Sequence, residues 1–248
     1  MLDGKLVLVT GATRGIGKAI ALTLGNSGAT VIGTATTESG ADNVSKVFAE
    51  NKISGKGMKL DVTDNDQVSN LVKSVNENFG SVDILVNNAG IIRRNDAVDF
   101  TEEDWDAVID TNLKTLFFLS QAAAKGMIAQ GSGKIINIAS MLTFQGGIRV
   151  PSYTASKSGV GGLTKAMANE WAAKGVNVNA IAPGYIETNN TAALQADENR
   201  NRQIVERIPA GRWGKAEDIG GAAVFLASSA ADYVNGHILA VDGGWLAR

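Results

Sequence analysis

Short apolar runs alternate with longer amphipathic segments along almost the whole chain. The runs are typical of buried strands, and apolar residues at helical spacing indicate helices between them. The runs predict strands at 6–9, 30–33, 57–61, 84–86, 135–138, 176–181 and 238–241. The spacing predicts helices near 16–28, 44–48, 64–75, 101–130, 152–174 and 217–227. This alternation predicts an α/β fold with right-handed crossovers and a doubly wound parallel sheet covered on both faces.

Residues 188–212 are the most polar and least periodic part of the chain. A simple surface excursion is one interpretation of such a segment. Because long polar segments beside a ligand cleft commonly close over it, we expect a mobile substrate lid at 188–212.

Composition narrows the class of protein. The 248 residues include no cysteine, which excludes disulfide scaffolds and thiolate metal sites, and no metal site is expected. The 23 basic and 25 acidic residues give a net charge of −2, which argues against a broad nucleic-acid-binding surface. No run of about 18 apolar residues predicts a membrane span, and no apolar leader is evident at the start. We therefore expect a cytoplasmic protein without nucleic-acid or membrane partners.

The turn after the first predicted strand is rich in glycine. Residues 10–17 read Thr-Gly-Ala-Thr-Arg-Gly-Ile-Gly, with glycines at 11, 15 and 17. Such glycines let the backbone approach a pyrophosphate, and the next helix offers its N-terminal N–H groups to the anion. The spacing departs from the common Gly-x-Gly-x-x-Gly, but its place between strand and helix indicates a dinucleotide site.

The residues near this turn bear on which dinucleotide is bound. A free ribose 2′-hydroxyl is usually held by an acid at the end of the second strand, but here Thr36 precedes the first acid, Glu38. Arg14, in the glycine turn, could pair with a 2′-phosphate. These features favour NADP(H), with NAD(H) as the alternative. Asp61 could accept a hydrogen bond from the adenine or simply cap the following turn.

Tyr153 and Lys157 form the candidate catalytic pair. They are four residues apart and so share one face of a predicted helix. A nearby ammonium lowers the pKa of a tyrosine, which suits proton exchange with a carbonyl or an alcohol. On its own the spacing also fits an ordinary surface pair. Ser140 ends a strand where its hydroxyl could hold the substrate oxygen, and Asn112 could hold a water that links Lys157 to solvent.

A serine nucleophile with a histidine base is the rival interpretation of Ser140. The only histidine is His237, beside the last predicted strand, and nothing around Ser140 marks a nucleophile elbow. We therefore expect a structural role for His237. Two further segments, 87–90 (Asn-Asn-Ala-Gly) and 183–188 (Pro-Gly-Tyr-Ile-Glu-Thr), end strands and could line the same cleft.

In this order and spacing, these motifs resemble the short-chain dehydrogenase/reductase family over the whole chain. The resemblance implies one Rossmann-like domain, dependence on NAD(P)(H), and a homotetramer. It implies that Tyr153 donates the proton, Lys157 lowers the pKa of Tyr153 and holds the nicotinamide ribose, Ser140 orients the carbonyl, and Asn112 supports the proton relay. The implied cofactor contacts are Gly11, Thr13, Arg14, Gly15, Ile16, Gly17, Thr36, Asp61, Val62, Asn88, Ala89, Gly90, Tyr153, Lys157, Pro183, Gly184, Ile186 and Thr188.

The two parts of the chain resemble different members of that family. Residues 1–90 are similar to 3-oxoacyl-[acyl-carrier-protein] reductases, whereas the chain from Ile92 onward is similar to 2-deoxy-D-gluconate 3-dehydrogenases, as a chimera would be. A sugar acid needs a cation for its carboxylate and donors for its hydroxyls. We therefore expect a keto-deoxy sugar acid or the matching alcohol as substrate, with fatty acid synthesis as the alternative and a non-catalytic dinucleotide binder as a third. The candidate substrate residues are Arg94, Gln145, Arg149 and Asn190.

Overall fold

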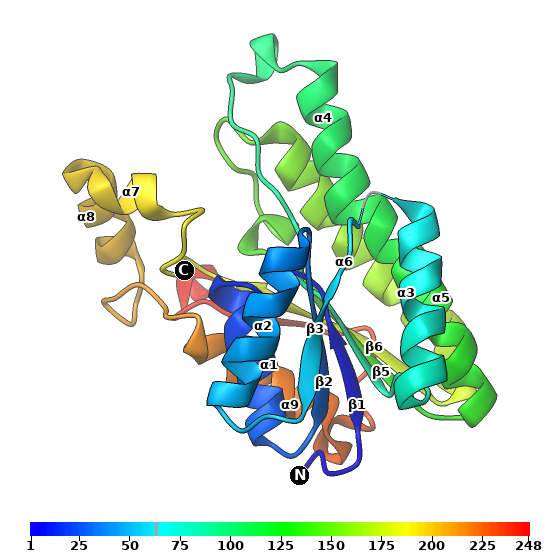
Figure 1. Cartoon of the computed structure of the whole chain (residues 1–248). Coiled ribbons are helices and arrows are strands. Elements are labelled where there is room, and N and C mark those ends of the chain that lie inside the picture. The colour runs from blue at the N-terminus through cyan, green and yellow to red at the C-terminus, as the bar shows by residue number, and fades with distance from the viewer. Residues whose placement is uncertain (63) are drawn as a thin grey trace.

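A computed structural model describes residues 1–62 and 64–248. Within these described ranges, seven parallel strands form one sheet in the order β3-β2-β1-β4-β5-β6-β7 (Figure 1). The strands are β1 (Leu6–Val9), β2 (Thr30–Ala35), β3 (Gly55–Lys59), β4 (Ile84–Asn87), β5 (Gly133–Ile138), β6 (Val176–Pro183) and β7 (Ile238–Val241). The helices are α1 (Gly15–Asn26), α2 (Glu38–Glu50), α3 (Asn65–Phe79), α4 (Glu102–Ile109), α5 (Thr115–Gln130), α6 (Pro151–Trp171), α7 (Ala192–Ala196), α8 (Glu198–Arg207) and α9 (Glu217–Ala227).

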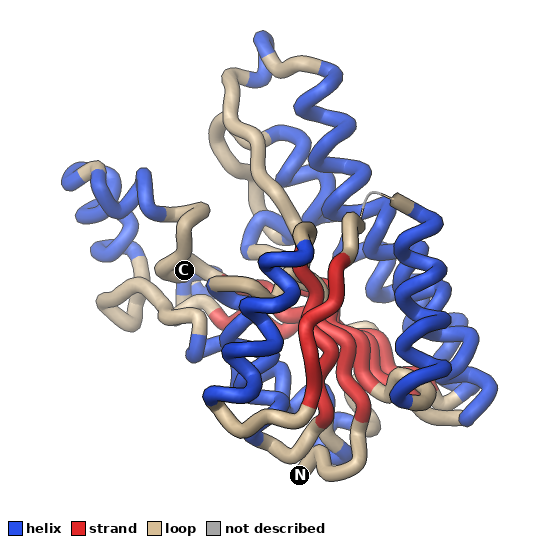
Figure 2. The backbone as a smooth tube through the Cα atoms, in the orientation of Figure 1, coloured by secondary structure: helices blue, strands red, loops and turns tan. Residues whose placement is uncertain are grey.

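Helices cover both faces of the sheet, as Figures 1 and 2 show. Alternate residues of β1 divide between the two cores. Val7 and Val9 pack in the cluster that includes α1, α2 and α9, whereas Leu6 and Leu8 pack in the cluster that includes α3, α5 and α6. Two-sided burial explains why the strands read as continuous apolar runs. The predicted fold class is confirmed.

Two predicted elements differ in the structure. The third strand was expected at 57–61, but its pairing with β2 runs from Gly55 to Lys59, so Asp61 lies beyond the strand. The long helix expected at 101–130 is divided into α4 and α5 by a π-helical turn at Asp110–Lys114. Hydrophobic spacing could not show this turn, because the whole segment keeps a helical pattern.

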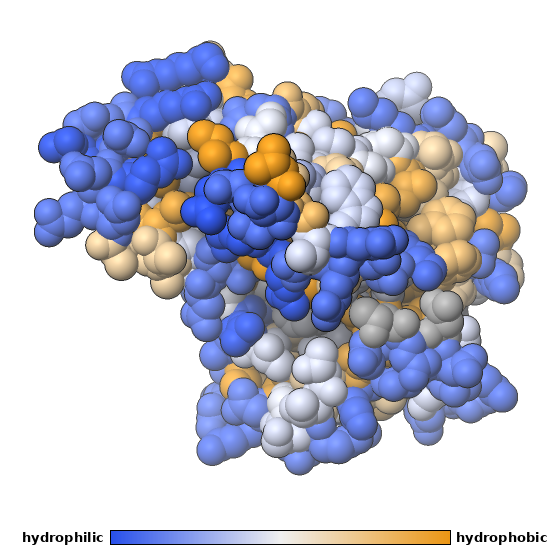
Figure 3. Space-filling view, turned by 90° about the horizontal axis from the view of Figure 1, so that it is seen from above, coloured by the Kyte–Doolittle hydropathy of each residue, from blue (hydrophilic) through white to orange (hydrophobic). Residues whose placement is uncertain are grey.

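The polar segment 188–212 contains α7 and α8, which form a separate lobe beside the sheet (Figure 1). A small apolar cluster, which includes Ile204, Ile208, Trp213 and Trp245, joins this lobe to the rest of the molecule. Viewed from above, the lobe at the left presents mainly hydrophilic residues (Figure 3). The proposed lid is therefore helical.

The strand order reverses between β1 and β4, the usual place for a ligand in an open parallel sheet. The glycine turn follows β1 at this point, and residues 88–90 follow β4. The carboxyl ends of β5 and β6 lie along the same edge. In the described part of the chain, no helix is both long enough and apolar enough to span a membrane.

Candidate active site

The glycine turn packs closely against the start of α1, the helix that follows it. Gly11 and Gly15 have φ angles of 67° and 54°, which favour glycine. A Cβ on Gly17 would lie 2.2 Å from the carbonyl oxygen of Gly11, so only glycine lets α1 pack this closely. Arg14 begins α1 without a side-chain cap, and the first turn carries no acid. The exposed helix amides therefore suit an anion such as pyrophosphate.

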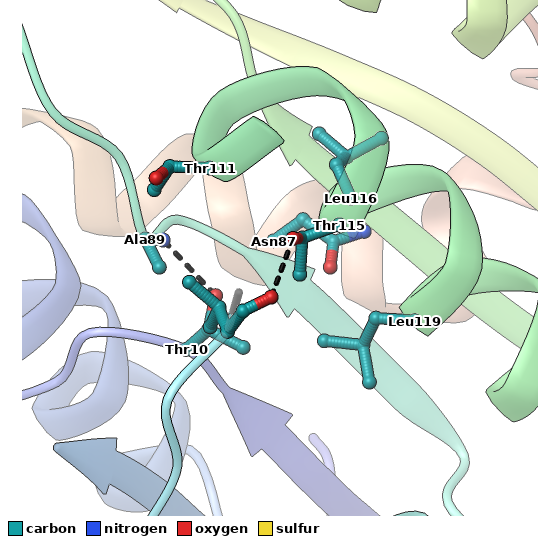
Figure 4. A pocket seen from close by; sticks show the side chains of 8 residues that line it. Thr10, Asn87, Ala89, Thr111, Thr115, Leu116 and Leu119 are labelled. Carbon is teal, nitrogen blue, oxygen red and sulfur yellow. Dashed lines mark hydrogen bonds between the residues drawn. The ribbon is translucent and has the colours of Figure 1, made fainter. Parts of the chain in front are cut away.

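Thr10 and Asn88 join the glycine turn to the end of β4. The Thr10 hydroxyl accepts hydrogen bonds from the N–H groups of Asn88 and Ala89, both 3.0 Å long (the second is drawn in Figure 4). The Asn88 amide donates to the carbonyl oxygens of Thr10, at 2.9 Å, and Gly11, at 3.1 Å. Asn88 thus fixes the conformation of the glycine turn.

A small cavity of about 10 Å³ lies beneath these strand ends (Figure 4). Asn87 lines it together with Thr10, Thr111 and Thr115, and its Oδ1 atom has no hydrogen-bond partner among the described residues. This volume is near that of a single water probe. It is far too small for a nucleotide, so a cofactor would have to lie above it, along the sheet edge.

The end of β2 borders the glycine turn. The Gly11 N–H donates to the Thr34 hydroxyl at 3.2 Å, and the Ala12 N–H donates to the Thr34 carbonyl at 2.9 Å. Arg14 and Thr36 are both exposed beside this junction. Glu38 lies 4.0 Å from Lys59 across the neighbouring strand. A cation and a hydroxyl are therefore available where the adenosine ribose would lie.

The candidate cofactor cradle is the groove between the glycine turn and the segment after β6, and this segment forms its opposite wall. A Cβ on Gly15 would lie 3.5 Å from the methyl group of Thr188, so the two segments are neighbours. Thr191 fixes this segment by donating to the Ile186 carbonyl at 2.6 Å, and Gly184 donates to Val241 at 3.0 Å. With its closed glycine turn, free helix amides and facing wall, the edge fits a dinucleotide.

Two predicted cofactor contacts, Asp61 and Val62, lie beyond the end of β3. The Asp61 N–H donates to the Gln67 side chain at 3.0 Å, and the Val62 carbonyl accepts from the Thr115 hydroxyl. These bonds join the segment after β3 to α3 and α5. The side-chain role of Asp61 toward adenine stays a prediction.

Tyr153 and Lys157 lie on one face of α6, as their spacing predicted. The Lys157 ammonium is 5.6 Å from the centroid of the Tyr153 ring. Lys157 is buried, and its Nζ donates to the Ile138 carbonyl at 2.6 Å, at the end of β5. Ser140 follows that strand, is 8 % exposed and shares a side-chain hydrogen bond with Tyr153. The structure thus brings the three predicted residues together.

The pKa shifts differ from the simple expectation that Lys157 lowers the pKa of Tyr153. Burial raises the pKa of Tyr153, while the hydrogen bond from Ser140 and the charge of Arg94 act in the opposite direction. Burial also lowers the pKa of Lys157 to about 8. The expected net lowering at Tyr153 is therefore wrong for this geometry, because removal from water outweighs the nearby charges. Tyr153 therefore keeps its proton at neutral pH.

Asn112 lies in the π-helical turn and is 1 % exposed. Its Oδ1 accepts from the Ile91 N–H at 2.8 Å, and its Nδ2 donates to the Ile91 carbonyl at 2.9 Å and to Ser156 at 3.3 Å. These bonds tie the loop after β4 to α6. The Asn112 side chain is therefore mainly a brace in this structure, and a relay water on its amide stays a prediction.

A cavity of about 470 Å³ opens beside Ser140 and Tyr153. Three of the four predicted substrate residues line it, namely Arg94, Gln145 and Asn190. Arg149 does not line it, although it is close to Tyr153 in sequence. Its exposed guanidinium lies 2.9 Å from Asp96, and its φ of 63° turns the chain at this point. The expected role of Arg149 as the carboxylate partner is therefore not supported.

Sequence reasoning missed the contribution of α8 to this cavity. Arg200, Gln203, Ile204 and Arg207 line it, at positions i, i+3, i+4 and i+7 of one helix face. That spacing was a visible signal, but the segment as a whole is so polar that no helix was predicted there. The aromatic residues Tyr185 and Trp245 also line the cavity, with ring centroids 4.7 Å apart.

The serine–histidine alternative is not compatible with the topology. His237 immediately precedes β7 at its amino end, whereas Ser140 follows the carboxyl end of β5. Because the strands are parallel, these ends lie on opposite edges of the sheet. The His237 N–H donates to Asn179 at 2.9 Å, and its carbonyl accepts from Ala180. Its backbone therefore extends the pairing of the last strand.

Comparison with known proteins identifies the family. A family model described as enoyl-(acyl carrier protein) reductase matches residues 11–246. The chain is 56 % identical over 248 residues to the 2-dehydro-3-deoxy-D-gluconate 5-dehydrogenase of Escherichia coli K12, covering 100 % of this chain and 97 % of that protein. It is 48 % identical to a 3-oxoacyl-[acyl-carrier-protein] reductase of Vibrio cholerae, covering 98 % of each. A structure of a candidate 2-deoxy-D-gluconate 3-dehydrogenase from Agrobacterium tumefaciens with bound NADP has a TM-score of 0.93 and 59 % identity, covering 100 % of this chain and 98 % of that one.

The chain belongs to the short-chain dehydrogenase/reductase family. It is an NAD(P)-dependent oxidoreductase that interconverts a small-molecule secondary alcohol and a ketone. The predicted resemblance is confirmed, and sugar-acid dehydrogenases are more similar to the chain than the acyl-carrier-protein reductase is. Both kinds of relative align over nearly the whole chain, and the chimeric origin stays a prediction.

Proposed function

We propose that the enzyme oxidises a secondary alcohol of a keto-deoxy sugar acid, or reduces the corresponding ketone, with NADP(H). The lining of the cavity carries this proposal. Among the described residues, Arg94, Arg200 and Arg207 line it together with side-chain amides, and no acidic residue does. A carboxylate and several hydroxyl groups need such a combination of cations and hydrogen-bonding groups. The similarity to a 2-dehydro-3-deoxy-D-gluconate 5-dehydrogenase supports the same substrate class.

Each catalytic residue has a distinct task in this proposal. The Ser140 hydroxyl orients the substrate oxygen, and Tyr153 donates a proton to that oxygen during reduction or takes it during oxidation. Lys157 holds the ribose of the cofactor and supplies positive charge beneath the tyrosine. Asn112 keeps the loop after β4 and the catalytic helix together. NADP(H), when bound, supplies or accepts the hydride at the substrate carbon.

NADP(H) is the preferred cofactor in this proposal, with NAD(H) as an alternative. Arg14 and Thr36 are exposed beside the ribose end of the cradle and suit a 2′-phosphate. Bound NADP in the similar Agrobacterium structure supports this choice. The remaining predicted cofactor contacts are proposed with it: Gly11, Thr13, Gly15, Ile16, Gly17, Asp61, Val62, Asn88, Ala89, Gly90, Pro183, Gly184, Ile186 and Thr188.

A 3-oxoacyl-carrier-protein reductase is the competing function, favoured by the similarity to the Vibrio protein. An acyl thioester needs an apolar channel and a basic docking patch for its acidic carrier. The cavity has apolar walls, but three arginines and three side-chain amides also line it. Those cations and amides favour a sugar acid, because an acyl chain has no partner for them.

The assembly and location belong to the same proposal. Trp105 and Phe118 are each 41 % exposed on α4 and α5, and Phe225 is 40 % exposed on α9. Partly exposed aromatic side chains on two separate surfaces would suit a homotetramer with two kinds of interface. A cytoplasmic location would give the enzyme access to the cellular NADP(H) pool. The helices α7 and α8 would serve as the substrate lid.

Steady-state kinetics test the function directly. The values of kcat/KM are compared for a six-carbon 2-keto-3-deoxy aldonate with NADP⁺ and for acetoacetyl thioester with NADPH, and each is repeated with NAD⁺ or NADH. We expect turnover of the sugar acid and a preference for the phosphorylated cofactor. A clear preference for the thioester would instead establish the competing function.

A further inference from the structure

The arginines of the cavity lie in two places. Arg94 comes from the loop after β4, and its Nη2 donates to the Asn190 carbonyl at 3.0 Å. Its charge acts on Tyr153, so it lies at the catalytic end. Arg200 and Arg207 come from α8, in the lobe across from α6 (Figure 1), and their charges act on Tyr185. The cavity thus has one arginine near Tyr153 and a pair of arginines on α8, which we call the lid cations.

The lid cations are held by neighbouring side chains without being neutralised. The Arg207 guanidinium lies 3.8 Å from the centroid of the Trp245 ring, and the Trp245 N–H donates to Gln145 at 3.3 Å. Arg200 donates to Gln203 at 3.1 Å. Among the described residues, no carboxylate lies within 4 Å of either guanidinium. A guanidinium stacked on an aromatic face keeps its donor edge free for an anion.

We infer that Arg200 and Arg207 bind the substrate carboxylate at the lid end of the cavity, with the reacting end of the substrate toward Ser140 and Tyr153. This inference rests on the proposed function and specifies the orientation of the substrate.

The same contacts give the lid a reason to close on the acid. The helix α8 joins the body through a small apolar cluster that includes Ile204 and Trp245. A carboxylate between the lid arginines and the cavity floor would add charge-assisted hydrogen bonds to that contact. A neutral analogue of the same shape would lack them. Selection for an acid is thereby coupled to enclosure of the reacting carbon.

The helix offers a matched control. Arg202 lies on the opposite face of α8, where its Nε is 4.0 Å from Glu206, and it does not line the cavity. The variants Arg200→Met, Arg207→Met, Arg202→Met and Arg94→Met are compared with the unmutated enzyme. Each is assayed with NADP⁺ and either the 2-keto-3-deoxy aldonate or its methyl ester. Circular dichroism and NADP⁺ titration verify folding and cofactor binding.

Loss of either lid arginine should raise KM for the acid about 10-fold to 100-fold, the effect of one charge-assisted contact, and should change KM for the ester little. Arg202→Met should behave like the unmutated enzyme. The inference is overturned if Arg94→Met alone removes the preference for the acid, or if neither lid variant raises KM for the acid. If the unmutated enzyme does not turn over the acid, the proposed function fails as well.

Discussion

Lys157 donates its 2.6 Å hydrogen bond to the Ile138 carbonyl, not to the phenol of Tyr153. The lysine is therefore anchored to the end of β5, the strand that leads into Ser140. This contact fixes the position of the ammonium relative to both catalytic hydroxyls. It also leaves a cation buried in the protein, with consequences for stability and for pH dependence.

Lys157→Met should stabilise the protein while abolishing activity. Burial lowers the pKa of Lys157 from 10.5 to about 8, whereas the unfolded chain keeps the ordinary value. Between those pH values the unfolded state binds more protons, so the free energy of unfolding of the unmutated protein rises with pH. At pH 7 burial of the charged lysine lowers the free energy of unfolding of the unmutated protein by about 3 kcal/mol. The substitution removes this penalty but also loses the hydrogen bond to Ile138, which offsets about 1 kcal/mol of the gain. Thermal unfolding at pH 7 and pH 10 checks the expected gain, with Lys165→Met as an exposed control on the same helix.

The rate of ketone reduction should fall as pH rises through about 8. Lys157 loses its proton in this range, because burial lowers its pKa to about 8. Tyr153 stays protonated over the same range, because burial raises the pKa of its phenol. The loss of activity therefore reports the lysine. The profile of kcat/KM against pH, measured at saturating cofactor, should show one descending limb. A value of kcat/KM that does not change up to pH 10 would contradict this assignment.

Tyr153→Phe should reduce kcat by at least about 100-fold, the lower range for loss of a positioned acid. The ring is retained, so α6 and its packing should not change. NADPH binding, followed by fluorescence titration, should stay within about twofold of the unmutated value. Near-normal turnover by the purified variant would exclude Tyr153 as the proton donor.

The sequence predicted the parallel sheet and the catalytic face because both depend on simple repeats. Apolar runs located the strands, and the four-residue spacing placed Tyr153 and Lys157 together. The spatial role of Arg149 could not be predicted this way, since a single backbone angle decides where its side chain lies. The lid arginines were missed for a different reason. Their helical spacing is clear within the ten residues of α8. Over a longer stretch of sequence the surrounding polar residues mask this spacing.

Arg14→Ala should weaken binding of NADPH about 10-fold to 100-fold and leave NADH binding nearly unchanged. The side chain is exposed at the start of α1, beside Thr36 at the end of β2. A charge-assisted contact with a 2′-phosphate contributes roughly 1.5–3 kcal/mol, and NADH has no such group. Titration of both cofactors measures the difference. Equal losses for the two would indicate that Arg14 shapes the glycine turn instead of recognising the phosphate.

Arg149→Ala should leave KM for the sugar acid within about twofold, because the guanidinium pairs with Asp96 at the surface. An exposed ion pair of this kind contributes about 0–1 kcal/mol to stability. The backbone at Arg149 has a φ of 63°, which is costly for any residue with a Cβ. Arg149→Gly should therefore be more stable than Arg149→Ala by about 1 kcal/mol, although both variants lose the ion pair. Denaturant unfolding of the two variants measures this difference, and kinetics with the acid and its methyl ester measure recognition. A selective increase in KM for the acid in both variants would return Arg149 to the substrate site.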